Sequence, residues 1–451
     1  MKIHFIAIGG SAMHNLAIAL KQNGDEVSGS DDEIFEPSRS RLAKHGLLPE
    51  KEGWHPEKIT NRLDAVILGM HARADNPELL KAQKLGLKIF SYPEFLYHHS
   101  RNKKRVVIGG SHGKTTITGM VMHVLKSVGM DFDYMVGSKL KDFDVMVRLS
   151  DKAPVMIFEG DEYLTSPIDR RPKFHWYRPH LALLTGIAWD HINVFPTFEN
   201  YVDQFREFIG LIENEGTLVF CSEDHLLKKL ALDSRGDIKK VSYSFPGYFV
   251  RDGVTHIETS GGAVSLKVFG KHNLMNINGA RLLCNEMGIN DHEFYQAISA
   301  FEGAANRLEL VRQNGENRLY KDFAHAPSKV RATIQAVREQ FPVHRLVACL
   351  ELHTFSSLSK EFLGEYRGSF EGVDEGCVFF SPHAVNMKRL PELHAEDVRE
   401  GFGNEKIAIF DDSKRMTGWL HEQKQPGTVF LMMSSGNFDG IDWKELSNQL
   451  V

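Results

Sequence analysis

Short apolar runs recur along the whole chain, and stretches with helical spacing of apolar residues lie between many of them. The first run, Ile3 to Ile8, is nearly continuous, which is typical of a strand buried on both faces of a parallel sheet. Strands that alternate with helices predict an α/β fold. The runs that we interpret as strands cover residues 3–8, 26–31, 64–69, 87–90, 106–108, 154–158, 181–184, 318–321, 345–350, 376–380, 406–410 and 428–433.

The length of the chain predicts several domains. At roughly 150 residues per domain, a chain of 451 residues is expected to hold about three. We expect an N-terminal Rossmann-like domain over residues 1–102, a central domain with a P-loop ATPase-like parallel sheet over 103–305, and a C-terminal Rossmann-like domain over 306–451.

The segment from Lys104 to Gly129 has the layout of a phosphate-binding loop. A strand pattern runs into a glycine-rich turn and then into apolar residues at helical spacing. In such loops backbone N–H groups and a helix N-terminus face the anion, a lysine adds a point charge, and a threonine hydroxyl holds Mg²⁺. Ile108 stands where the common pattern has its first glycine, so this is a short form; a glycine turn without a ligand is the alternative. The residues expected to bind phosphate are Gly110, Ser111, His112, Gly113, Lys114, Thr115 and Thr116.

Two further polar residues follow buried strands of the same segment. Glu159 comes directly after the 154–158 run, and His191 lies a few residues after the 181–184 run. An acid at the tip of a buried strand beside a phosphate loop is suited to recruit Mg²⁺. If the sheet is parallel, Thr115, Glu159 and His191 converge on one edge as candidate metal ligands. A solvated acidic turn and a structural histidine are the alternatives.

The N-terminal strand also leads into glycines. Gly9 and Gly10 continue through Ser11 into a helical stretch, and the second expected strand finishes on Asp31. A glycine turn for phosphate, with an acid about 20 residues further on for a ribose hydroxyl, forms the Rossmann arrangement. His71 follows the third strand and either contacts the ligand or caps the sheet. A nucleotide-type ligand is therefore expected at these residues, with a ligand-free turn as the alternative.

Three more polar clusters lie later in the chain. Asn273 and Asn276, before a helical stretch, either bind a purine or ribose or cap the helix. Asp322 and His325, after a strand, are placed to bridge to a nucleotide bound at the central domain. Ser435 and Gly436, in the glycine-rich turn that follows the last strand, either bind an anionic group or only turn the chain.

Composition excludes several classes of protein. The net charge of −5 and the dispersed basic residues predict no nucleic-acid surface, so a nucleic-acid motor is a poor hypothesis. No apolar run approaches the length of a membrane span, and the N-terminal run lacks a cleavage site, so we expect a cytoplasmic protein without membrane contact. The four cysteines lie far apart in the sequence and are expected to be reduced, mostly buried thiols.

Taken together, the motifs resemble those of the Mur ligase family of bacterial cell-wall synthesis, and the resemblance covers essentially the whole chain. It implies an ATP-dependent amide ligase of peptidoglycan synthesis, with a UDP-sugar-binding domain at 1–102, an ATP-binding domain at 103–305 and an amine- or peptide-binding domain at 306–451. Six motifs occur in the same order as in the family: the short Gly-x-x-Gly-Lys-Thr-Thr loop, Glu159–Tyr163, Asp190–His191, Gly270–Asn276, Asn306–Glu309 and Asp322–Pro327.

Within the family, the Gly9-Gly10 turn resembles the branch that acts on UDP-N-acetylmuramate itself, and the lack of a lysine from Tyr201 to Phe208 agrees with that branch. Segments 159–174, 322–325 and 434–441 resemble its recycling member, which adds the tripeptide L-alanyl-γ-D-glutamyl-meso-diaminopimelate. Segment 351–357 is instead similar to the L-alanine-adding member. The tripeptide is thus the expected amine and L-alanine the alternative.

The resemblance also implies a mechanism and roles for residues. ATP phosphorylates the lactyl carboxylate to an acyl phosphate, which the amine attacks, and closure occurs at a joint near Gly303 to Arg307. A monomer or weak homodimer is expected, and a catalytically inactive nucleotide-binding regulatory protein is the alternative from another class. The implied roles are catalysis for Lys114, Glu159 and His191; Mg²⁺ binding for Thr115, Glu159 and His191; adenosine binding for Asn273, Asn276, Arg307 and Asp322; and substrate binding for Gly9, Gly10, Ser11, Asp31, His71, His325, Ser435 and Gly436.

Overall fold

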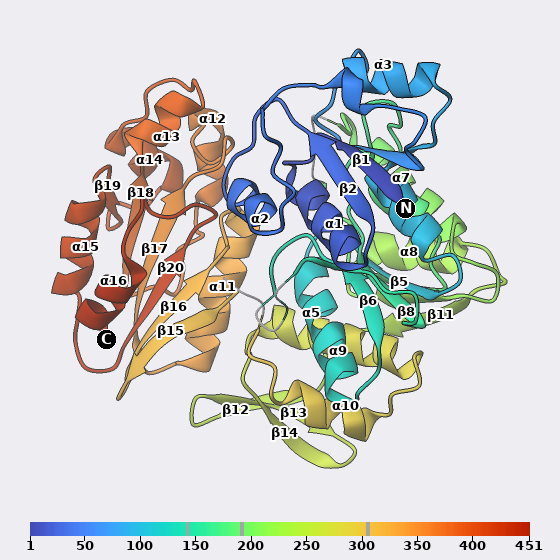
Figure 1. Cartoon of the computed structure of the whole chain (residues 1–451). Coiled ribbons are helices and arrows are strands. Elements are labelled where there is room, and N and C mark those ends of the chain that lie inside the picture. The colour runs from blue at the N-terminus through green and yellow to red at the C-terminus, as the bar shows by residue number, and fades with distance from the viewer. Residues whose placement is uncertain (141–142, 144, 190–193, 304–306) are drawn as a thin grey trace. The chain divides into compact units, whose positions relative to one another are not determined.

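The computed structural model describes residues 1–140, 143, 145–189, 194–303 and 307–451, and it confirms the three-domain α/β class. Three helix-covered sheets follow one another along the sequence (Figure 1). The chain forms two compact units. The first comprises Met1–Phe245 and Met275–Ile298, and the second comprises Pro246–Leu274 and Ser299–Val451.

The N-terminal sheet is parallel throughout, with the order β2-β1-β3-β4. Its first strand ends two residues before the predicted end at Ile8, because Ala7 adopts a left-handed backbone with φ of 65°. The glycine turn therefore starts directly from the sheet edge. The elements are β1 (Lys2–Ile6), α1 (Ser11–Gln22), β2 (Glu26–Ser30), α2 (Ser38–Lys44), β3 (Ala65–Leu68), α3 (Pro77–Lys84), β4 (Ile89–Ser91) and α4 (Tyr92–His99).

The central sheet has seven strands in the order β11-β10-β9-β5-β8-β6-β7, and only the edge strand β7 runs antiparallel. Its middle strands β9, β5 and β8 are almost entirely buried, as their apolar runs predicted. The strands are β5 (Lys104–Gly109), β6 (Phe132–Met135), β7 (Val147–Arg148), β8 (Val155–Glu159), β9 (Leu181–Leu184), β10 (Thr217–Cys221) and β11 (Lys239–Tyr243). The helices of this region are α5 (Lys114–Ser127), α6 (Lys173–Trp176), α7 (Phe198–Gly210), α8 (His225–Asp233), α9 (Lys271–Asn285) and α10 (Asp291–Ile298).

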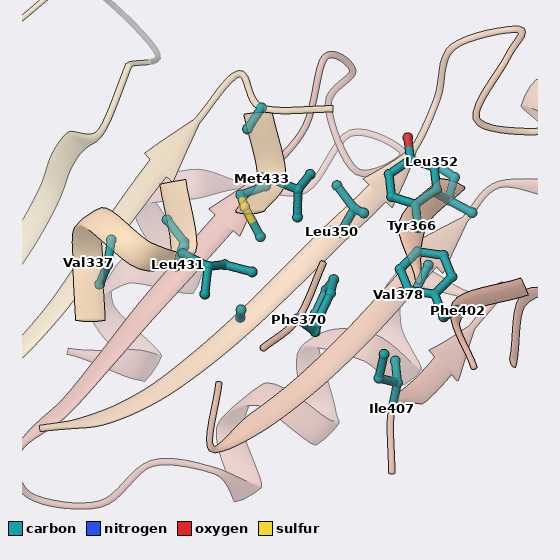
Figure 2. Close-up of a cluster of buried hydrophobic side chains, with 14 of the residues drawn as sticks. Val337, Leu350, Leu352, Tyr366, Phe370, Val378, Phe402, Ile407, Leu431 and Met433 are labelled. Carbon is teal, nitrogen blue, oxygen red and sulfur yellow. The ribbon is translucent and has the colours of Figure 1, made fainter. Parts of the chain in front are cut away.

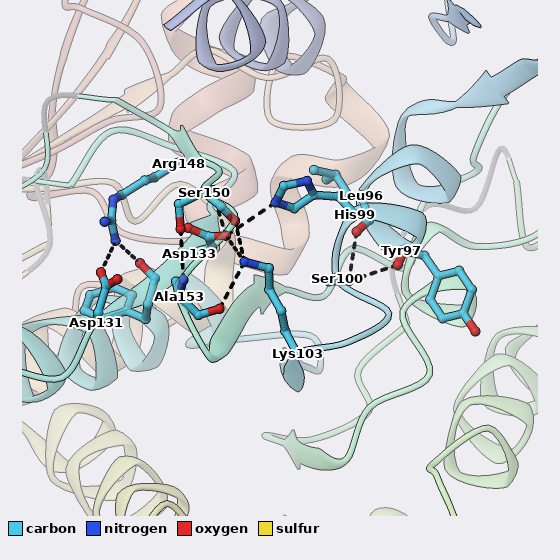
Figure 3. A network of polar contacts seen from close by, with 11 residues as sticks. Leu96, Tyr97, His99, Ser100, Lys103, Asp131, Asp133, Arg148, Ser150 and Ala153 are labelled. Carbon is cyan, nitrogen blue, oxygen red and sulfur yellow. Dashed lines mark hydrogen bonds and ion pairs between the residues drawn. The ribbon is translucent and has the colours of Figure 1, made fainter. Parts of the chain in front are cut away.

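A buried polar network fixes the edge of this sheet at β6 (Figure 3). Lys103 Nζ donates to Asp133 Oδ2 at 2.8 Å and to the carbonyl of Ala153 at 3.0 Å. Burial opposes ionisation of Asp133, but hydrogen bonds from His99, Lys103 and Ser150 outweigh it and lower the pKa of the carboxyl. The buried Asp133 charge is thus paired through its Oδ2 atom with Lys103, which links the segment before β5 to β6.

A small antiparallel sheet of the second unit was not predicted from the sequence. It consists of β12 (Tyr248–Arg251), β13 (Val254–Thr259) and β14 (Gly262–Leu266). The signal was present, because Asp252-Gly253 is a preferred two-residue hairpin turn, and both residues adopt positive φ.

The C-terminal sheet has the order β15-β16-β20-β17-β18-β19, parallel except for its edge strand β15. A large apolar cluster fills the space beside it, and the rings of Tyr366 and Phe402 stack there with centroids 5.0 Å apart (Figure 2). The strands are β15 (Glu309–Asn314), β16 (Asn317–Asp322), β17 (Arg345–Leu352), β18 (Glu375–Phe380), β19 (Ala408–Phe410) and β20 (Thr428–Met433). The helices are α11 (Pro327–Gln340), α12 (Lys360–Leu363), α13 (Pro382–Met387), α14 (Ala395–Phe402), α15 (Ser413–Glu422) and α16 (Trp443–Leu450).

The structure also bears on the expected state of the cysteines and on the expected absence of a membrane span. Cys221, Cys284, Cys349 and Cys377 are buried and free. Within the described ranges, no helix is long and apolar enough to cross a membrane.

Candidate active site

The predicted phosphate loop joins β5 to α5, and its glycines are required by the backbone. Gly113 is the N-cap of α5 with φ of 82°, and a Cβ atom there would lie 2.6 Å from Asn276 Oδ1. Gly110 has φ of 116°, and a Cβ atom there would collide with Thr185. A loop without side chains at these positions lets an anion approach the N–H groups of the first turn of α5.

The remaining loop residues differ in their surroundings. Ser111 is bound to the segment that follows β9. Its N–H donates to the carbonyl of Gly186 at 3.0 Å, and its hydroxyl donates to the carbonyl of Ala188 at 2.9 Å. His112 is exposed, whereas Thr116 is buried in the first turn of α5. The structure thus places all seven predicted loop residues in one turn.

The strand order brings Thr115 and Glu159 together, as predicted from the parallel sheet. Because β8 lies beside β5, Glu159 ends next to the loop, and the Thr115 hydroxyl donates to its Oε1 at 2.5 Å. Its Oε2 accepts from the N–H of Gly137 at 2.8 Å. The third predicted member, His191, lies outside the described residues.

Lys114 contacts a carboxylate that was not predicted as a site residue. Its Nζ lies 2.8 Å from Oε2 and 3.1 Å from Oε1 of Glu162, and it also donates to the carbonyl of Gly110 at 2.7 Å. Glu162 is only 2% exposed and accepts from the hydroxyl of Tyr201, on α7, at 3.2 Å. Its position three residues after Glu159, in the same acidic turn, was the available signal.

The chemistry of these residues fits a nucleotide polyphosphate with Mg²⁺. Magnesium prefers hard oxygen ligands and usually combines one or two protein groups with phosphate oxygens and water. Thr115 and Glu159 supply such oxygens beside a glycine cradle that a Cβ atom would fill. Over the part of the chain that the structure describes, no group of three or more His, Cys, Asp or Glu forms a separate metal site.

The N-terminal turn holds its predicted acid tightly. The N–H of Gly9 donates to Asp31 Oδ2 at 2.6 Å, and a Cβ atom on Gly9 would lie 2.9 Å from the same oxygen. Gly10 is the N-cap of α1, and Ser11 is its exposed first residue. His71 is exposed shortly after β3, the strand that pairs with β1. The structure therefore places all five predicted residues where strands of the N-terminal sheet end.

Burial raises the pKa of the Asp31 carboxyl to about 7; Asp32 raises it further, and the Gly9 N–H opposes the change. Because the folded chain holds this proton more tightly than the unfolded chain, the group stabilises the fold below its ordinary pKa of 3.8, and this contribution is lost as the pH rises through about 7. Asp31→Asn keeps an oxygen that accepts from Gly9 but carries no charge. As the pH rises from 5 to 8, the Tm of the variant should therefore increase by a few degrees relative to the Tm of wild type. An unchanged difference across this range would contradict the buried, proton-binding carboxyl.

The structure corrects the placement of Asn273 and Asn276. Both were interpreted as residues before a helix, but α9 begins at Lys271, so both lie inside it. Asn273, in the second unit, donates through Nδ2 to the carbonyl of Phe269 at 2.9 Å. Asn276, in the first unit, faces Gly113 of the phosphate loop.

Arg307, Asp322 and His325 lie close together in the second unit. Asp322 Oδ2 accepts from the N–H of Leu308 at 2.7 Å, which ties the segment after the predicted joint to the end of β16. The guanidinium carbon of Arg307 lies 4.9 Å from the ring centre of Phe323, and His325 Nδ1 lies 2.9 Å from the carbonyl of Phe323. Residues 304–306 of the predicted joint lie outside the described ranges.

A second buried carboxylate links two segments that are distant in sequence. Glu351 lies near the end of β17, is 2% exposed, and accepts from the N–H of Phe438 at 2.8 Å and from the hydroxyl of Ser434. Glu351 therefore joins segments 351–357 and 434–441, for which the sequence resemblance pointed to different amines.

The turn after β20 has an unsatisfied polar atom. The hydroxyl oxygen of Ser435 is buried and has no hydrogen-bond partner within the described ranges. Gly436 is packed so closely that a Cβ atom would lie 2.6 Å from His353 Cγ. A buried hydroxyl without a partner favours a ligand contact at this turn.

Family models match three consecutive parts of the chain. The Mur ligase family, catalytic domain, matches residues 2–104; the Mur ligase middle domain matches 108–284; and the Mur ligase, glutamate ligase domain, matches 306–436.

Individual relatives fall into two kinds. A UDP-N-acetylmuramate–L-alanine ligase of Arthrobacter sp. is 30% identical and covers 84% of this chain and 80% of its own length. A UDP-N-acetylmuramate–L-alanyl-gamma-D-glutamyl-meso-2,6-diaminoheptandioate ligase of Haemophilus influenzae is 28% identical and covers 98% of both chains. Among solved structures, a UDP-N-acetylmuramate-alanine ligase of Thermotoga maritima has the same fold, with a TM-score of 0.69, 22% identity, and coverage of 100% of this chain and 98% of its own.

Proposed function

The chain belongs to the Mur ligase family of ATP-dependent, amide-forming ligases of peptidoglycan synthesis, and we propose that it joins the lactyl carboxylate of UDP-N-acetylmuramate to the amine of L-alanyl-γ-D-glutamyl-meso-diaminopimelate. The observation that carries the activation step is the contact of Thr115 and Glu159 beside the Lys114 loop. UDP-N-acetylmuramate as the acceptor is supported by relatives of both kinds, whose names share it.

The proposed route begins with the repulsion between an anionic carboxylate and a polyphosphate. Lys114 and the loop N–H groups lower that repulsion by binding phosphate oxygens, while Thr115 and Glu159 would hold Mg²⁺, which supplies further positive charge when bound. A carboxylate has a poor leaving group, so its activation as an acyl phosphate lets an amine displace phosphate. Gly9, Gly10, Ser11, Asp31 and His71 are proposed to bind the UDP-sugar, and Asn273, Asn276, Arg307 and Asp322 the adenosine.

The amine is proposed from the second unit and has two candidates. The tripeptide is supported by the resemblance of segments 159–174, 322–325 and 434–441 to the ligase that adds it. L-alanine is supported at least as well, because segment 351–357 resembles that ligase and the 30% identical relative carries that name. His325 would lie on the substrate side in either case.

A comparison of the two amines as substrates tests the proposal. Phosphate release is measured with UDP-N-acetylmuramate and ATP, offering the tripeptide or L-alanine in turn. We expect kcat/KM to be at least ~100-fold higher with the tripeptide, because rejection of an analogue that leaves buried polar groups unpaired reaches this size. Turnover with L-alanine alone would replace the tripeptide with L-alanine, and turnover with neither would refute UDP-N-acetylmuramate as the acceptor.

A further inference from the structure

A buried pair of side chains, Glu162 and Tyr201, lies behind the lysine of the phosphate loop. Glu162 is 2% exposed and Tyr201 is fully buried, whereas the Lys114 side chain is 19% exposed. The pair reaches the loop at two points. Glu162 accepts from Lys114 Nζ at 2.8 Å, and the Tyr201 hydroxyl lies 3.3 Å from Ser111 Oγ.

Counting the protons of the ammonium group shows what this contact leaves available. A lysine ammonium has three donors. Within the described ranges, Lys114 Nζ gives one proton to the carbonyl of Gly110 and one to the Glu162 carboxylate. Nζ also lies 3.1 Å from Oε1 of the same carboxylate, and this longer contact is the one that a ligand phosphate would replace. The two fixed acceptors also restrict the rotamers of a long side chain, whose free motion otherwise opposes binding.

We infer that Glu162, held in place by Tyr201, is a positioning residue that orients Lys114 toward the phosphate of the nucleotide before the nucleotide arrives. The inference rests on the proposed binding of ATP at this loop, and it assigns a role to two residues that contact the lysine rather than the substrate. Tyr201 is the fourth residue of α7, so this helix takes part in shaping the phosphate loop.

Binding of ADP, measured by calorimetry without any ligation, tests the inference. Glu162→Ala should weaken ADP binding about tenfold, because the lysine loses the charge-assisted hydrogen bond that orients it, and the loss of one such bond changes affinity by about this factor. Glu162→Gln should restore affinity to within about threefold of wild type, since the amide oxygen still accepts from Nζ. Tyr201→Phe should fall between the two. Asp169→Ala is the matched control, because Asp169 pairs with Arg171 at 2.8 Å and not with the loop lysine, and it should bind ADP as wild type does.

A double-mutant cycle separates positioning from general support of the fold. In a Lys114→Ala background, Glu162→Ala should have no further effect on ADP affinity, because its partner is gone. An equal effect in both backgrounds would overturn the inference, and so would tighter ADP binding by Glu162→Ala, which would mean that the carboxylate competes with phosphate. Failure of wild-type protein to bind ADP at all would instead refute the proposed function of the loop.

Discussion

Replacing Lys114 with alanine should reduce ATP-dependent ligation by about 10³-fold or more while the fold is retained. The ammonium is a positive charge at the phosphate loop with a side chain that is 19% exposed. Removing a charge that stabilises a phosphoryl-transfer transition state has effects of about this size. The measurement is phosphate release with UDP-N-acetylmuramate and the preferred amine, with circular dichroism and thermal denaturation as checks of the fold.

The alanine variant also leaves the Glu162 carboxylate buried without its cation, which destabilises the loop region. A second variant, Lys114→Ala with Glu162→Gln, removes that charge and should be equally inactive but more stable. Lys104→Ala is the matched control, because this lysine begins β5, the strand that leads into the loop, and its ammonium donates to the carbonyl of Glu286 at 3.0 Å. Ligation by the Lys114 variants at near wild-type rates would contradict the assigned role.

The layered α/β architecture was predictable because buried parallel strands are almost wholly apolar. The apolar parts of β5, β8 and β9 were predicted from these runs, although β5 begins two residues before its apolar run and includes the buried Arg105. Their mutual order did not follow from the sequence. That Glu159 would reach Thr115 required the strands to be parallel and adjacent, and the structure meets both conditions.

Contacts made by side chains across loops were not predictable in the same way. Lys114 and Glu162 are 48 residues apart, and Glu351 and Ser434 are 83 residues apart. Neither separation leaves a periodic signal, because each pairing depends on which strands become neighbours and how each loop turns. The start of α9 was also missed, since the polar residues Lys271 to Asn273 hid a helix that packs only from Asn273 onward.

Replacing Glu159 with glutamine should reduce ligation by about 10²-fold and should raise the Mg²⁺ concentration needed for half-maximal rate about tenfold. Glutamine retains the shape and one oxygen but loses the charge that attracts a divalent cation. The same change removes a negative charge beside the phosphate loop, so ADP binding in the absence of Mg²⁺ should be unchanged or tighter. A loss of Mg²⁺-dependent binding alone therefore separates a metal ligand from a residue that only supports the loop.

Steady-state rates and ADP calorimetry across a Mg²⁺ series provide both readouts. Asp169→Asn, ten residues further along the chain and paired with Arg171, is the matched control and should leave the Mg²⁺ dependence as in wild type. Equal weakening of ADP binding with and without Mg²⁺ in Glu159→Gln would mean that Glu159 acts through Thr115 and Gly137, to which it is hydrogen-bonded, and not through the cation. Because the two hypotheses differ in the metal dependence rather than in the size of the loss, a fall in activity alone decides nothing between them, and the Mg²⁺ series does.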